Sequence, residues 1–317
     1  MSDPRKHHYV PRFYLANFSS LEGKKHRLWV YEKGREPRKS TPILEGCRKD
    51  FYAFVENGQR NIEVEVWLST LEAAVARLIA DLAQGKRGPN PNERIRLAVF
   101  MGTLFTRTPF GRQMDESLFA PAVTKRIKSL ANDPEAFYKL YAEFNAEPSS
   151  RELAEQARQE VLSGKSDELE EDEPFRLASI IHVGIQYGEV LSEMDWQFIH
   201  SPEDQLFITS DNPVICEMGD PNDPRAVHLR SGPNHPNAAA WLPLTSRVCL
   251  LMHRGLVPGV ATAPAKAVRE INKRTMMCAD KRIYASELSE SLREAFEKHG
   301  CQLPIEKLDL RYEGQPL

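Results

Sequence analysis

The spacing of apolar residues changes twice along this chain, and these changes limit the folds that it can form. Residues 27–31 read Arg-Leu-Trp-Val-Tyr, an aromatic and β-branched run that is typical of a β-strand. Between residues 62 and 82 the apolar side chains recur at every third or fourth position, which predicts an amphipathic helix. After residue 194 the apolar runs are short again and are separated by Pro, Asp and Asn turns. Strands and helices that are segregated rather than alternating predict an α+β fold.

Three sub-regions follow from this pattern. We expect a small β unit over residues 1–60, a helical region over residues 61–193 and a β-rich region over residues 194–317. Residues 7–54 are expected to be mostly extended, and Asn92 is expected to cap the second helix. At 317 residues, of which 41% are apolar, the chain can bury a core large enough for one domain. We therefore expect one domain, 1–317, in which these regions pack together.

The charge balance excludes a surface that is basic overall. The 42 Lys and Arg residues are outnumbered by 45 Asp and Glu residues, which gives a formal net charge of -3. A nucleic acid or nucleotide would therefore have to be bound at a local basic site. No stretch approaches the roughly 18 apolar residues that a membrane helix needs, and residues 1–8 lack the apolar core of a secretion signal. We expect a cytoplasmic protein without membrane contact, whose oligomeric state the sequence leaves open.

The densest group of reactive side chains lies at residues 7–18, which read His-His-Tyr-Val-Pro-Arg-Phe-Tyr-Leu-Ala-Asn-Phe. Neighbouring side chains of an extended segment point to opposite faces, so His7 and His8 are expected to point apart. The proline stiffens the backbone ahead of Arg12. A functional interpretation makes His8 a metal ligand or general base and Arg12 an anion clamp. The alternative is that the imidazoles and Arg12 are satisfied within the fold and the aromatic rings only pack.

A second group of polar residues is Ser210-Asp211-Asn212-Pro213, which lies between two apolar runs. Short polar side chains at the end of a strand often belong to a site, so Asp211 is a candidate metal ligand and Ser210 and Asn212 are candidate ligand-binding residues. The same residue types also form turns readily, and a turn between two strands explains them without chemistry.

Carboxylates and arginines of the helical region form a third group of candidates. Glu65 and Glu72 are seven residues apart and therefore lie on nearly the same helix face, and Glu65 interrupts an apolar cluster. Arg107 and Arg112 follow the helix expected over residues 93–106 and could bind phosphate oxygens bidentately. The alternative is a solvated acidic face and two arginines that complement the negative end of a helix.

The first two motifs together resemble the family named domain of unknown function 4238 (DUF4238). Its members open with His-His-Tyr-Val-Pro-x-Phe-Tyr-Leu, matched here at residues 7–15, and carry a later Ser-Asp-Asn-Pro, matched at residues 210–213. The similarity extends over nearly the whole chain and implies no established reaction. The first motif is also similar to the metal-binding strand of His-Asn-His endonucleases. Asn17 and His26 follow in the required order, but His26 precedes an expected strand instead of lying on a helix.

The leading functional hypothesis is a metal-dependent, nuclease-like hydrolase of phosphodiester bonds, used in bacterial defence. In it, His8 and Asp211 bind a divalent ion (Mg²⁺, Mn²⁺ or Zn²⁺), and His7 or Glu65 activates water. Arg12 or Arg107 then stabilises charge on the phosphate. The alternative hypothesis is a non-enzymatic protein that binds an anionic ligand or a partner chain through the same arginines and imidazoles.

Overall fold

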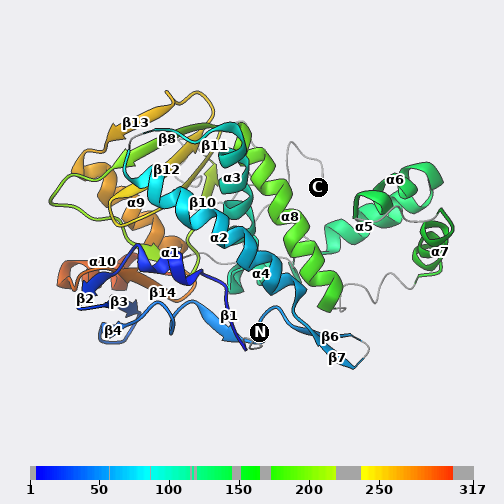
Figure 1. Cartoon of the computed structure of the whole chain (residues 1–317), viewed down its shortest axis with the longest axis horizontal. Coiled ribbons are helices and arrows are strands. Elements are labelled where there is room, and N and C mark those ends of the chain that lie inside the picture. The colour runs from blue at the N-terminus through cyan, green and yellow to red at the C-terminus, as the bar shows by residue number, and fades with distance from the viewer. Residues whose placement is uncertain are drawn as a thin grey trace.

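The computed structural model describes residues 5–56, 58–85, 87–114, 116–117, 120–144, 151–164, 173–218 and 237–302. It confirms the mixed α+β fold, in which sheets built from the two ends of the chain pack against helices from its middle (Figure 1). Among these residues, no helix is both long and apolar enough to cross a membrane.

The N-terminal part is made of short strands and one short helix. Its elements are β1 (Lys6–His8), α1 (Arg12–Ala16), β2 (Ser20–Glu22), β3 (Lys25–Glu32), β4 (Arg38–Ser40), β5 (Cys47–Lys49), β6 (Phe54–Glu56) and β7 (Gln59–Asn61). β1 pairs antiparallel with β5, and β6 pairs with β7 as a hairpin. In β1, His7 lies opposite Arg48, so the first histidine is held in a regular ladder.

The expectation of a mostly extended backbone is wrong at α1. Pro11 is the N-cap of this helix, and its carbonyl accepts a hydrogen bond from Leu15 N at 3.0 Å. The turn places Tyr14 and Leu15 in the core, where both side chains are fully buried. The aromatic residues of this segment favour a strand by local preference. Burial of two large side chains on one side of a helical turn overrides that preference.

The middle of the chain is helical, as expected. Its elements are α2 (Glu63–Ala83), α3 (Pro91–Thr106), α4 (Pro109–Met114), α5 (Ala120–Ala131), α6 (Pro134–Phe144), α7 (Arg151–Leu162) and α8 (Glu173–Glu193). α5, α6 and α7 form a group at one end of the molecule (Figure 1). Asn92 does not cap α3. Asn90 does, because its side chain accepts from Glu93 N at 3.0 Å and Glu93 Oε2 accepts from Asn90 N at 2.9 Å, with Pro91 starting the helix.

α3 and α8 approach each other closely because glycine lies at their contact. A Cβ atom added at Gly188 would lie 2.7 Å from the carbonyl oxygen of Ala98, and one added at Gly184 would lie 2.8 Å from Thr106 Oγ1. Any side chain at these positions would separate the helices. The spacing fixes where the C-terminal end of α3, and the residues that follow it, lie relative to α8.

The C-terminal part supplies most of the sheet structure. Its elements are β8 (Asp195–His200), β9 (Thr209–Ser210), β10 (Ile215–Met218), β11 (Ala238–Pro243), β12 (Val248–His253), β13 (Gly259–Thr262), α9 (Ala265–Cys278), β14 (Arg282–Ala285) and α10 (Glu290–His299). One five-stranded sheet has the order β10-β11-β12-β8-β13, and only its β13–β8 pairing is parallel. The other has the order β2-β3-β14-β9, with β4 on β3. This second sheet joins the two ends of the chain.

The apolar run at residues 206–209 enters a regular strand only at its last residue, Thr209, in β9. Asn272 on α9 takes the place of a neighbouring strand: its Oδ1 accepts from Ile208 N at 3.1 Å, and its Nδ2 donates to Leu206 O at 2.8 Å. Backbone groups bonded by a side chain do not form a ladder, so regular pairing begins only at β9.

Candidate functional site

The two sequence motifs meet in the folded chain. Tyr14 OH donates to Pro243 O at 2.6 Å and lies 2.8 Å from Thr209 Oγ1. Because the tyrosine proton is used on the carbonyl, the Thr209 hydroxyl is the donor in the second bond. Asn17 Nδ2 also donates to Leu244 O at 3.0 Å. β9 therefore packs against the N-terminal segment through Thr209, the residue that precedes Ser210.

The two histidines of β1 have different environments, as their alternation predicts. His7 is fully buried; its Nδ1 accepts from Tyr52 N at 2.9 Å, and its ring stacks on that of Tyr52 with centroids 5.8 Å apart. Arg60 Nη2 lies 3.2 Å from the other ring nitrogen. These contacts favour a structural role for His7. His8 is only half-buried, and burial lowers its pKa, with the nearby Arg12 cation acting in the same direction. Its Nε2 is buried without a hydrogen-bond partner in the part of the chain that the structure describes.

Ser210, Asp211 and Asn212 fasten the turn between α9 and β14. Asp211 Oδ1 accepts from Asp280 N at 2.9 Å, and Oδ2 accepts from Lys281 N at 2.9 Å and Arg282 N at 3.0 Å. Ser210 Oγ accepts from Asn212 N at 3.1 Å, and Asn212 Nδ2 donates to Cys278 O at 2.6 Å. Burial, with the Asp280 charge adding to it, raises the pKa of Asp211 to about 7. The three side chains thus have roles in the fold, and their predicted ligand-binding roles stay a prediction.

The sequence analysis predicts a metal site whose ligands are His8 and Asp211. No group of three or more His, Cys, Asp or Glu side chains within the described ranges is arranged to hold an ion. A metal ion at Asp211 would compete with three backbone N–H donors for the carboxylate oxygens. His8 Nε2 has no such competitor among these residues.

A groove of about 490 Å³ lies beside His8 between α1, β3 and the segment that precedes β5. We call it the Arg12 groove; its lining residues are Arg12, Phe13, Ala16, Lys25, His26, Thr41, Pro42 and Ile43. Arg12 and Lys25 are exposed, and neither side chain pairs with a carboxylate among the described residues. None of the lining residues is acidic. The groove is therefore a local cationic site on a chain whose net charge is negative.

The sequence indicates Arg12 as an anion clamp, but it does not indicate Lys25, and it indicates His26 only through the similarity to His-Asn-His endonucleases. The β2–β3 hairpin brings these residues beside α1. Gly23, with φ of +64°, lies in its turn, and Ser20 pairs with Arg27 across it. His26 Nδ1 lies 2.7 Å from Ser19 Oγ. The glycine between two short polar runs was the available signal.

A second group of charges, which we call the Arg107 cluster, consists of Tyr52, Glu65, Glu72, Arg107 and Arg112. Arg107 is 1% exposed; its Nη1 donates to Glu72 Oε1 at 2.8 Å, and its carbonyl accepts from Tyr52 OH at 3.1 Å. Burial, reinforced by the Glu72 charge and opposed by Arg107, raises the pKa of Glu65 to about 7. Arg112 Nη2 donates to Phe51 O in the loop before β6, and its Cζ lies 6.0 Å from the centroid of the Tyr52 ring. The structure thus brings together four predicted candidates around Tyr52.

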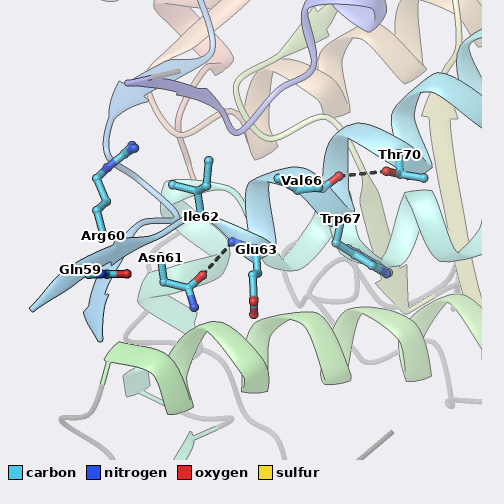
Figure 2. A pocket seen from close by; sticks show the side chains of 8 residues that line it. All are labelled: Gln59, Arg60, Asn61, Ile62, Glu63, Val66, Trp67 and Thr70. Atoms are coloured by element: carbon cyan, nitrogen blue, oxygen red, sulfur yellow. Dashed lines mark hydrogen bonds between the residues drawn. The ribbon is translucent and has the colours of Figure 1, made fainter. Parts of the chain in front are cut away.

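A shallow depression of about 700 Å³ covers β7 and the first turns of α2 (Figure 2). In it, Asn61 Oδ1 accepts from Glu63 N at 2.8 Å, which forms an Asx-turn around Ile62, the N-cap of α2. Val66 is 57% exposed and Trp67 is 38% exposed. This depression is not lined by any of the candidate residues that the sequence analysis names.

The comparisons with known proteins agree with the two motifs. A family model described as "Protein of unknown function (DUF4238)" matches residues 6–289 of the chain. No curated protein and no solved structure matches it.

Proposed function

The chain belongs to the DUF4238 family, described as of unknown function, and we propose that it binds a phosphate-containing ligand in the Arg12 groove. One observation carries the proposal: Arg12 and Lys25 project into a groove whose lining contains no carboxylate. A guanidinium binds two phosphate oxygens at once, and an ammonium adds a point charge beside it. Arg38 on the neighbouring strand β4, by contrast, is paired with Glu45 at 2.6 Å.

The apolar lining indicates what accompanies the phosphate. Phe13, Pro42 and Ile43 form part of the groove, and Ile43 is 50% exposed. Apolar and aromatic surface next to a cationic pair suits a base or another flat apolar group bonded to a phosphate. A nucleotide or a short single strand of nucleic acid has this composition.

The finer form of the proposal is hydrolysis of the bound phosphodiester. Its support is His8, whose lowered pKa keeps the imidazole neutral at pH 7 and whose Nε2 has no partner among the described residues. A neutral imidazole accepts a proton from water or binds a divalent ion, whereas an imidazolium does neither. His8 would then act next to the phosphate held by Arg12, as base or as metal ligand.

Binding is tested by titrating the protein with ATP and with a fluorescent single-stranded oligonucleotide. Arg12→Ala and Lys25→Ala should each weaken binding about tenfold, since hydrogen bonds to charged groups contribute roughly 1.5–3 kcal/mol. Arg35→Ala is the matched control, because Arg35 is an exposed arginine outside the groove. Equal affinity of all three variants and the original protein would remove the proposal.

Hydrolysis is tested separately by incubating the same ligands with Mg²⁺, Mn²⁺ or Zn²⁺ and measuring product release. We expect His8→Ala to lose turnover while it retains binding. If the ligands bind but no metal ion supports turnover, the proposed hydrolysis is refuted and only the proposed ligand binding stands.

A further inference from the structure

The guanidinium of Arg107 is satisfied on one side only. Its Nη1 donates to Glu72, but Nε and Nη2 are buried and have no hydrogen-bond acceptor among the residues that the structure describes. These two nitrogens carry their hydrogens on the same edge of the planar group, and this edge matches the two oxygens of a carboxylate or phosphate. A buried cation with a complete unpaired donor edge is costly for folding alone.

The groups that interact with Arg107 belong to two other parts of the chain. Glu65 and Glu72 interact with Arg107 from α2, and Tyr52 donates to its carbonyl from the loop before β6, while Arg107 itself follows α3. Tyr52 also interacts electrostatically with Arg112 on α4. Arg112 also pairs with Glu173 at 3.0 Å. When Glu65 is protonated, the two arginines therefore face the two carboxylates of Glu72 and Glu173, and the local charge is close to zero instead of negative.

We propose that the Arg107 cluster is a second ligand site, which binds a carboxylate, phosphate or similar oxyanion through Nε and Nη2 of Arg107, with Glu65 beside the bound anion. The site does not depend on the Arg12 groove. The cluster reaches the surface at Glu72 and Arg112, whose side chains are each 21% exposed.

Glu65 gives this site a dependence on pH. Because burial, the Glu72 charge and the Arg107 cation together place its pKa at about 7, Glu65 is mostly protonated at pH 6 and mostly ionised at pH 8. An ionised Glu65 repels a second anion and can itself occupy the Arg107 edge. We therefore expect anion binding to weaken as pH rises through 7.

The experiment titrates the full-length protein with sulfate and, separately, with acetate, because both anions stay ionised between pH 6 and pH 8. The side-chain Nε–H resonance of Arg107 is followed by ¹⁵N NMR and assigned from its loss in Arg107→Lys. At least one anion should shift this resonance, with an affinity about tenfold higher at pH 6 than at pH 8, the size of one pKa unit of coupling. Sulfate alone would indicate a phosphate-like ligand, and acetate alone a carboxylate.

Two variants separate this site from its alternatives. Glu65→Gln should remove the pH dependence and bind at pH 8 as the original protein does at pH 6. Arg12→Ala should leave the Arg107 shift unchanged, and its failure to do so would place the anion in the Arg12 groove. If Arg107→Lys does not fold, the affinity for the anion and its dependence on pH are compared between Glu65→Gln and the original protein by calorimetry, which needs no assignment of the resonance.

Two results overturn the proposal. One is an Arg107 Nε–H resonance that neither anion moves at either pH. The other is a resonance that differs between Glu65→Gln and the original protein before any anion is added, and that anions do not move in either protein. Glu65 itself would then be the partner of the Nε and Nη2 edge of Arg107.

Discussion

Replacement of Asp211 by Asn should change how the stability of this protein depends on pH. Asp211 is 3% exposed, and its pKa rises from 3.8 to about 7 on folding, chiefly because burial disfavours the charged form. The folded protein binds this proton more tightly than the unfolded chain does. The contribution of Asp211 to stability is therefore greatest below pH 3.8 and is lost as pH rises towards 7.

The size of the effect follows from the shift. About three pKa units correspond to roughly 4 kcal/mol, which is the most that the original protein can lose between pH 4 and 7 relative to Asp211→Asn. Asn cannot ionise and still presents one oxygen to the backbone N–H groups of residues 280–282. The amide NH₂ group of Asn faces backbone N–H groups and changes the free energy of unfolding by the same amount at every pH. It therefore does not alter the slope of the free energy of unfolding against pH.

The measurement is the free energy of unfolding in urea at half-unit steps of pH, followed by tryptophan fluorescence. Asp204→Asn is the matched control, because Asp204 is an exposed carboxylate in the same half of the chain. We expect the two Asn variants to diverge as pH rises. Parallel curves for Asp211→Asn and the original protein would refute the argument, because they would mean that folding leaves this pKa unchanged.

Three further changes test the packing and the metal prediction. Tyr14→Phe should destabilise the protein by about 1–3 kcal/mol in urea unfolding, because it leaves the Thr209 hydroxyl and a buried carbonyl without partners; an unchanged midpoint would contradict this. Gly188→Ala should cost about 1–3 kcal/mol by overpacking, whereas Gly88→Ala, which meets no atom within 4 Å, should be nearly neutral; equal midpoints would show that the helices can separate freely. A divalent ion bound at His8 should raise the melting temperature more at pH 8 than at pH 5.5, since neutral imidazole is the ligand, and His8→Ala should abolish the rise. A rise that persists in His8→Ala would place the ion elsewhere.

Local patterns predicted much of the fold. The three-to-four-residue spacing after Asn61 became α2 because such a helix buries one continuous apolar face. The run that includes Trp29 became β3. Local patterns were wrong where two signals competed: Asn90 and Asn92 both suit a cap, and only Asn90 has Glu93 three residues after it. They were wrong again at α1, where tertiary burial determined the conformation of an aromatic segment.

The sequence by itself determined which residues were candidates, because it shows where titratable side chains are crowded together or interrupt apolar runs. Tertiary structure alone decided their partners. Pairing of β3, β14 and β9 brought Asp211 to the backbone of residues 280–282, and the end of α3 brought Arg107 to Glu72. These contacts join residues 35 to 71 positions apart, and no local spacing encodes them. The physical reason is that a side chain's chemistry is set by burial and by neighbouring charges, which depend on how distant segments pack.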